Sequence, residues 1–153
     1  MTPDAELGGA SAMQRKLILM RHGHAEELRD DFARRLTEAG RGAARRSGQA
    51  LAVAGFSPER ILTSPARRAH ETAELVAEAC GGALQAEPTL YLTEEGPHLN
   101  ALRGLPDTFR RVLLVGHNPT LSALARKLGE PGVELRPAEY VELWLELDSW
   151  QDL

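Results

Sequence analysis

Three short segments of the chain bring guanidinium and imidazole side chains to the ends of apolar runs. Arg21 and His22 directly follow "LILM", and His117 follows "VLLVG". Arg67 and Arg68 lie just beyond "ERILTS". Arginine presents a planar fork of donors that suits phosphate oxygens, and a neutral imidazole can attack phosphorus to form a covalent intermediate. These residue types predict a site that binds and transfers a phosphoryl group.

The elements that must position these residues are strands alternating with helices. Continuous apolar runs at 17–20, within 59–64 and at 112–115 are typical of strands covered on both faces, as in a parallel sheet. Helical patterns separate them, which predicts a three-layer α/β fold with a mostly parallel central sheet flanked by helices. Residues 140–147 alternate between apolar and polar, which predicts a half-exposed C-terminal strand at an antiparallel edge.

Two of the predicted helices begin with the same pattern, an N-cap residue followed by proline. Ser64 precedes Pro65, and Asn118 precedes Pro119. Helix N-termini attract anions, and ligands of open α/β sheets bind beyond the carboxyl ends of the strands, so the three segments are expected to converge there. The inner stripes predicted for the three helices are Ala39, Ala43, Ser47, Ala50, Leu51 and Ala54; Ala69, Ala73, Val76 and Cys80; and Leu121, Leu124, Ala125 and Leu128.

Length and composition limit the classes of protein. The 153 residues suit one domain, and the net charge of -4 argues against a general nucleic-acid binder, so any phosphate site must be focal. The single cysteine excludes an intramolecular disulfide framework and a cysteine-built metal site. No apolar run reaches the roughly 18 residues of a membrane span, so we expect a soluble cytoplasmic protein with no membrane partner. We expect residues 1–14 to form a disordered extension, with either Met1 or Met13 as the native start, and residues 15–153 to form one domain.

Four motifs in order resemble the histidine phosphatase superfamily, also called the phosphoglycerate mutase-like family. They are "RHG" at 21–23, "LTEAG" at 36–40, "SPARRAHET" at 64–72 and "VGHNP" at 115–119. The resemblance covers roughly residues 16–128 and implies the phosphoglycerate mutase-like fold and a hydrolase without a cofactor. The short chain, the simple "HNP" motif and the lack of a large insertion are similar to the SixA-type phosphohistidine phosphatase branch.

The resemblance also implies a role for each site residue. His22 corresponds to the nucleophile, and Arg21 and Arg68 to the arginines that bind the phosphoryl oxygens. The family pattern "SPxxRAxxT" selects Arg68 rather than Arg67. His117 corresponds to the second histidine, which donates to the phosphoryl group. Each of these residues is expected to lie in one pocket.

Two further residues are candidates for the rim of that pocket. Arg34 in "RRLTEAG" is either a substrate contact at the rim or a surface charge. His24 forms an H-x-H pair with His22, and such pairs bind zinc, with His117 available as a third ligand. Neither an HExxH motif nor a pattern of carboxylate ligands accompanies the pair, so we predict no metal. The remaining histidines, His70 and His98, are expected on the surface.

Glu94 in "LYLTEEG" bears on the class of substrate. Phosphatases of this superfamily that cleave esters use a glutamate in the corresponding segment to protonate the leaving oxygen, since an alkoxide leaves poorly. Phosphohistidine releases a neutral imidazole and depends less on such an acid. Glu94 is therefore either a general acid for a phosphate ester or an acidic loop residue of no catalytic role.

The leading hypothesis is a metal-independent phosphatase that acts through a phosphohistidine on His22. Its partner would be a protein carrying phosphohistidine, and the first alternative is a small phosphorylated metabolite cleaved as a phosphomonoester. A second alternative is a non-catalytic module that binds phosphate or a phosphoprotein. An ordinary nucleotide-binding domain does not fit, because the chain has neither GxxxxGK[ST] nor GxGxxG.

Overall fold

The computed structural model describes residues 14–153, in which strands and helices alternate along the chain. The α/β class predicted from the apolar runs is confirmed. The elements are β1 (Gln14–Arg21), the 3-10 helix η1 (Asp31–Ala33), α2 (Glu38–Val53), β2 (Arg60–Thr63), α3 (Arg67–Cys80), β3 (Ala83–Ala86), η2 (Pro88–Tyr91), α4 (Glu95–Arg103), β4 (Arg111–Gly116), α5 (Thr120–Leu128), β5 (Tyr140–Glu146) and η3 (Trp150–Asp152).

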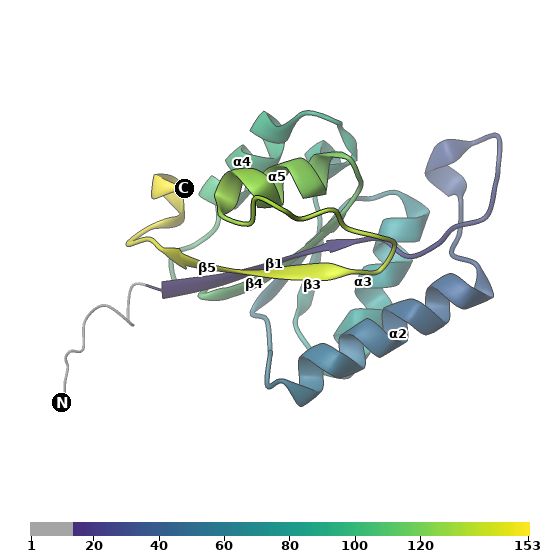
Figure 1. Cartoon of the computed structure of the whole chain (residues 1–153), viewed down its shortest axis with the longest axis horizontal. Helices are drawn as coiled ribbons and strands as arrows, with labels where there is room; N and C mark the ends of the chain where they lie inside the picture. The colour runs from purple at the N-terminus through teal and green to yellow at the C-terminus, as the bar shows by residue number, and fades with distance from the viewer. Residues whose placement is uncertain (1–13) are drawn as a thin grey trace.

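The strands form one sheet in the order β3-β2-β4-β1-β5. The β3-β2, β2-β4 and β4-β1 pairs are parallel, and β5 pairs with β1 antiparallel, as the alternation at 140–147 predicted. Figure 1 shows α4 and α5 on one face of the sheet and α2 and α3 on the other, which gives three layers.

The central strands contain continuous apolar runs because both of their faces are covered. Leu17 and Leu19 of β1 face a core shared with α4 and α5, whereas Ile18 and Met20 face a core shared with α2 and α3. All four side chains are fully buried. The edge strand β5 differs, since Leu143 and Leu145 are buried while Trp144 between them is 60% exposed.

The inner face of α2 differs from the predicted stripe. Of the six residues expected inside, Leu51 alone is buried, and the buried face consists of Gly40, Ala44, Gly48 and Leu51. The reason is the close approach of α2 to α3: a Cβ atom on Gly48 would lie 3.0 Å from the Cα of Val76. A pattern of apolar side chains does not mark glycine as an inward residue, although only glycine fits at the contact with Val76. The stripe predicted for α3 is buried, and so are Leu121, Leu124 and Ala125 of α5.

The two predicted helix starts lie earlier in the chain than the observed ones. Helices α3 and α5 begin at Arg67 and Thr120, while Ser64 and Asn118 accept hydrogen bonds from the backbone N–H groups of Ala66 and Ser122. The side chain of Ser64 therefore stabilises the turn before α3, and that of Asn118 stabilises the first turn of α5. Short elements without a strong period, β3 and α4, were not predicted.

The predicted N-terminal extension lies almost wholly outside the described residues. Residues 1–13 are not described, and Gln14 is already the first residue of β1. Within 14–153, no helix combines the length and the apolar composition that crossing a membrane requires.

Gly40 and Gly42 of α2 provide a test of how tightly the start of this helix is packed. A Cβ atom on Gly40 would lie 2.1 Å from the backbone oxygen of His24, whereas one on Gly42 would meet only the flexible end of Arg46. We expect Gly40→Ala to lower the free energy of unfolding by about 2 kcal/mol or more through steric conflict. Gly42→Ala should raise it by up to about 1 kcal/mol through helix propensity. Urea denaturation of both variants measures the two changes, and equal effects would contradict the packing.

Candidate active site

The site lies at the carboxyl ends of three adjacent parallel strands. Strand β4 lies between β2 and β1, and the helices that follow β1 and β4 cover opposite faces of the sheet (Figure 1). Such a reversal opens a crevice at the carboxyl ends of the strands, where ligands of α/β sheets bind. His22, Ser64 and His117 are the first residues after β1, β2 and β4. The predicted convergence of the three segments is what the topology produces.

The ring of His22 has one nitrogen tied to the backbone and one facing the pocket. Its Nδ1 lies 2.7 Å from the carbonyl oxygen of Gly23. A carbonyl only accepts, so Nδ1 carries the proton and Nε2 carries the lone pair. Nε2 accepts from Nε of Arg68 at 3.4 Å. This tautomer leaves Nε2 as the nitrogen that can attack phosphorus.

His117 stands beside His22, with 5.1 Å between the ring centroids. Its Nε2 lies 2.8 Å from Oγ of Ser64, and its Nδ1 is buried without a hydrogen-bond partner among the described residues. Nε of Arg21 is buried in the same way. Buried polar atoms without partners are uncommon in folded proteins, and these two are free to donate to or accept from a bound group.

Both imidazoles are held neutral at pH 7. Burial lowers the pKa of His22 to about 4, with the charges of Arg68 and Arg21 acting in the same direction and the hydrogen bond to Gly23 opposing them. Burial lowers the pKa of His117 to about 3, and the charge of Arg68 and that of His22 in its protonated form act in the same direction. A neutral ring is the form that a nucleophile requires.

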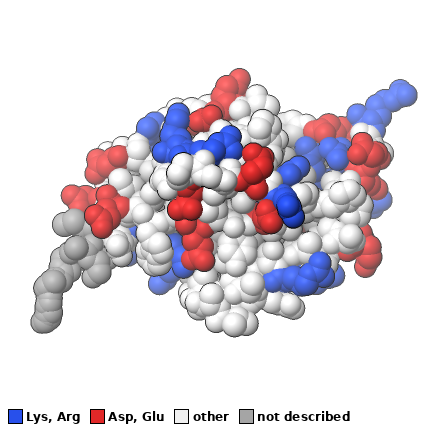
Figure 2. Space-filling view, in the orientation of Figure 1, with Lys and Arg blue, Asp and Glu red and all other residues white. Residues whose placement is uncertain are grey.

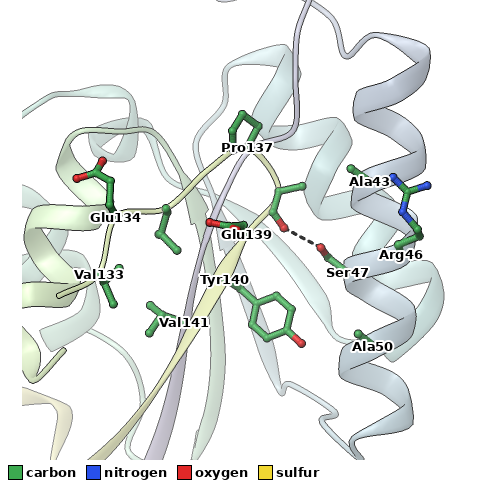
Figure 3. A pocket seen from close by; sticks show the side chains of 12 residues that line it. Ala43, Arg46, Ser47, Ala50, Val133, Glu134, Pro137, Glu139, Tyr140 and Val141 are labelled. Carbon is green, nitrogen blue, oxygen red and sulfur yellow. Dashed lines mark hydrogen bonds between the residues drawn. The ribbon is translucent and has the colours of Figure 1, made fainter.

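Arg21 is positioned by the segment that leads into β5. Its Nη1 donates to the carbonyl oxygen of Leu135 at 3.1 Å, and its own carbonyl accepts from the N–H of Ala138 at 3.0 Å. A hollow of about 620 Å³ lies between this segment and α2 (Figure 3). Oγ of Ser47 bridges the hollow to the oxygen of Ala138 at 2.7 Å. None of the predicted site residues lines this hollow, so the hollow lies outside the candidate site.

Arg68 is buried and uses all three of its nitrogens. Besides the contact with His22, Nη1 donates to the backbone oxygen of Asp31 at 2.7 Å and Nη2 to its Oδ2 at 3.1 Å. The side chain of Arg68 is 8% exposed, against 56% for Arg67, which pairs with Glu71 at 3.6 Å. The structure therefore places Arg68, not Arg67, against the candidate nucleophile.

Asp31 and Tyr91 are site residues that the sequence analysis did not identify. The hydroxyl of Tyr91 donates to Oδ2 of Asp31 at 2.7 Å, and Nη1 of Arg34 donates to Oδ1 at 3.1 Å. The hydrogen bond from Tyr91, joined by those from Arg34 and Arg68, lowers the pKa of Asp31 to about 2, so the carboxylate is ionised at neutral pH. The sequence signal for Asp31 is its position three residues before Arg34, a spacing at which opposite charges can pair. Tyr91 comes from η2, where no motif marks it.

The two rim candidates lie on the loop between β1 and α2. Arg34 donates through Nε to the oxygen of Glu26 at 2.8 Å, and its charge contributes to the lowered pKa of His22. His24 is exposed, with Nδ1 3.0 Å from Oγ1 of Thr37, the residue that caps α2. No group of three metal-ligating side chains is found in the described part of the chain.

Glu94 and His98 lie at the start of α4. Glu94 is exposed and is the N-cap residue of this helix, and its role as an acid stays a prediction. His98 was expected on the surface, and that expectation is wrong: its side chain is fully buried, with Nδ1 2.8 Å from the oxygen of Glu94. The error follows from missing α4, because His98 shares the buried face of this helix with Leu102, four residues further on.

Positive charge at the site is local. Figure 2 shows Lys and Arg side chains intermingled with Asp and Glu over the face in view, with no broad basic field there. Arg68 is instead buried against His22, and the half-buried Arg21 adds a second charge that acts on the same ring. Such a focal arrangement suits one phosphoryl group better than a polyanion.

The family model of the histidine phosphatase superfamily (branch 1) matches residues 17–94. This chain belongs to the histidine phosphatase superfamily. An uncharacterised chloroplastic protein of Arabidopsis thaliana is 26% identical over 94% of this chain and 72% of its own length. Membership makes the protein an enzyme of the phosphatase class, and the fold is the phosphoglycerate mutase-like one.

Solved structures of SixA proteins are similar to this histidine phosphatase. A protein of Nakamurella multipartitia, provisionally identified as the phosphohistidine phosphatase SixA, gives a TM-score of 0.79 at 24% identity, over 91% of this chain and 88% of that one. The protein histidine phosphatase SixA complexed with tungstate gives 0.76 at 26% identity, over 83% and 86% of the two chains. The similarity places the chain with the SixA type within its superfamily.

The neutral imidazoles make the stability of this histidine phosphatase depend on pH. In the unfolded chain both rings take up protons below about pH 6.5, whereas in the folded protein they stay neutral down to about pH 4 and 3. The unfolded state therefore binds more protons in this window, and the free energy of unfolding falls as the pH is lowered. Each ring contributes a slope of up to about 1.4 kcal/mol per pH unit.

Urea denaturation of the wild type and of His117→Gln at pH 7, 6 and 5, in buffers without phosphate, measures this dependence. The variant should lose one ring's share of the slope. Parallel stability curves for the two proteins would contradict a neutral His117 in the folded state.

Proposed function

We propose that this histidine phosphatase acts through a phosphohistidine on His22 and that its substrate is phosphohistidine in a protein. The observation that carries the proposal is the tautomer of His22, whose Nε2 lone pair faces Arg68 while Nδ1 is held by the oxygen of Gly23. A metal ion has no part in the proposed reaction. The nucleophile is neutral, and the cations that the phosphoryl group needs are supplied by arginine.

The proposed reaction has two steps. Nε2 of His22 attacks phosphorus in line, the bond from phosphorus to the leaving nitrogen breaks, and that nitrogen takes a proton from solvent water. Water then attacks the phosphorus bound to His22, the P–N bond breaks, and inorganic phosphate and the neutral ring are released. Arg21, Arg68 and His117 would donate to the equatorial oxygens, where charge accumulates in the transition state.

Ionised Asp31 would position Arg68 during both steps. It engages Nη1 and Nη2 of that arginine from one side, while Nε points to His22. A guanidinium held at three nitrogens loses little conformational freedom when the phosphoryl group binds. The negative charge of Asp31 also offsets part of the positive charge that surrounds two uncharged rings.

One comparison and one feature of the fold support the class of substrate. The similar SixA protein named a protein histidine phosphatase was solved with tungstate, a tetrahedral oxyanion like phosphate. In this chain, η1 and its flanking loop are the only described residues between β1 and α2, so within 14–153 no separate domain is inserted there. An uncapped site admits a phosphorylated side chain on another protein.

Phosphate release from a phosphohistidine-bearing protein tests the proposal directly. We expect release in the presence of EDTA at a kcat/KM at least about tenfold above that for a panel of phosphate esters. His22→Ala should abolish release and also the acid-labile phosphoenzyme trapped from labelled substrate. Preference for esters would support the phosphomonoesterase alternative instead. No release from any substrate, with retained binding of a phosphorylated partner, would support a binding module.

Glu94→Gln tests whether an acid is used on any ester that the enzyme cleaves. If Glu94 protonates an alkoxide, its loss should slow ester turnover by about 100-fold or more. The effect on phosphohistidine should be much smaller, because imidazole is the better leaving group. The neighbouring Glu95→Gln provides the matched control, since Glu95 pairs with Lys127 at 3.2 Å. Equal small effects of both variants on esters would exclude Glu94 as the acid.

A further inference from the structure

Four aromatic rings form a continuous row that leads away from the nucleophile. The centroid of His117 lies 5.1 Å from that of His22 and 5.7 Å from that of Tyr91, and Tyr91 lies 5.2 Å from Phe32. The last two contacts have the edge-to-face geometry that aromatic pairs prefer. Phe32, at the end of the row, is 44% exposed. The site therefore continues into an aromatic surface that the proposed chemistry does not use.

A hollow of about 450 Å³ adjoins the end of this row. Three of its lining residues are chain neighbours of site residues: Phe32 follows Asp31, Pro65 follows Ser64, and Arg67 precedes Arg68. The backbone that borders the hollow is thus continuous with that of the site, and the ring contacts from Phe32 through Tyr91 to His117 link the two. The hollow, which we call the flanking groove, is lined by Phe32, Ala33, Pro65, Arg67, His70 and Ala86.

The flanking groove is chemically apolar. Phe32, Ala33, Pro65 and Ala86 present only carbon from their side chains, and the cation of Arg67 is paired with Glu71. The second titratable member, His70, lies 3.7 Å from Glu74. Two further large apolar side chains, Leu28 and Leu92, are exposed on the loops that carry η1 and η2. Exposed large apolar side chains on the same loops as a mostly apolar groove are typical of a surface that binds a partner.

We propose that the flanking groove is a specificity subsite that receives an apolar side chain of the substrate protein, close in sequence to its phosphohistidine. This inference rests on the proposed function. A polar metabolite would find only Arg67 and His70 as polar side chains there, each already beside a glutamate, whereas an aliphatic side chain would remove carbon surface from water on both sides. In an extended peptide, alternate side chains on one face are about 7 Å apart, so a residue two positions away can enter the groove.

Synthetic phosphohistidine peptides of seven residues test the subsite. One carries leucine and the other serine at the positions two residues from a central phosphohistidine, and phosphoramidate serves as a substrate with no flanking group. We expect the wild type to prefer the leucine peptide by about tenfold in kcat/KM, mainly through KM, as for a partly buried leucine side chain. The rate of phosphoramidate hydrolysis should not depend on the residues that line the groove.

Ala86 and Ala83, at opposite ends of β3, provide a matched pair of variants. Both are exposed, but only Ala86 lines the groove. Ala86→Gln places a neutral polar side chain in the groove without changing the charge near the phosphoryl group. It should reduce the preference for leucine to less than about threefold while leaving phosphoramidate hydrolysis unchanged. Ala83→Gln should retain the full preference.

The outcomes separate the two proposals. Turnover of both peptides at equal rates by the wild type would overturn the subsite alone. A preference for leucine that survives in Ala86→Gln would also overturn it, because the groove would not be its origin. Absence of turnover for phosphoramidate and both peptides would overturn the proposed function and, with it, the subsite.

Discussion

The parallel pairing of β1 with β4 is the constraint on which the site depends. Their ladder continues one step past the strands, where the N–H of His22 donates to the oxygen of Gly116 at 3.0 Å. The two histidines that follow these strands are thereby brought to 5.1 Å, although 95 residues of chain separate them along the sequence. Helices α2 and α5, which follow the two histidines, leave the sheet on opposite faces (Figure 1).

Around this pair, the charges are arranged so that the cations stay charged and the imidazoles stay neutral. Burial alone lowers the pKa of both rings, and the guanidinium groups of Arg21 and Arg68 add to the effect on His22. The same burial would destabilise an unpaired arginine, and Arg68 is accommodated because Asp31 meets two of its nitrogens. The contacts with Asp31 thus offset the free-energy cost of burying the charge of Arg68, and Tyr91 belongs to the same network.

That network links the polar site to its apolar surroundings. The hydroxyl of Tyr91 binds Asp31, while its ring lies between His117 and Phe32. Tyr91 thus contacts both the carboxylate that pairs with Arg68 and the exposed ring of Phe32. Substrate recognition and positioning of the catalytic groups would therefore depend on the same loop, residues 22–37. The start of this loop packs so closely on α2 that position 40 has no room for a side chain.

Much of this protein was determined by local sequence alone. Apolar runs on doubly covered strands, the alternation in β5 and the motifs around Arg21, His22, Arg68 and His117 act over a few residues, so the pattern of residues predicts the α/β class and the family. Tertiary structure decided the rest: the glycine face of α2, the burial of His98, and the contacts of Asp31 and Tyr91 with the site. Each depends on how closely distant segments approach, and a one-dimensional pattern does not contain that distance.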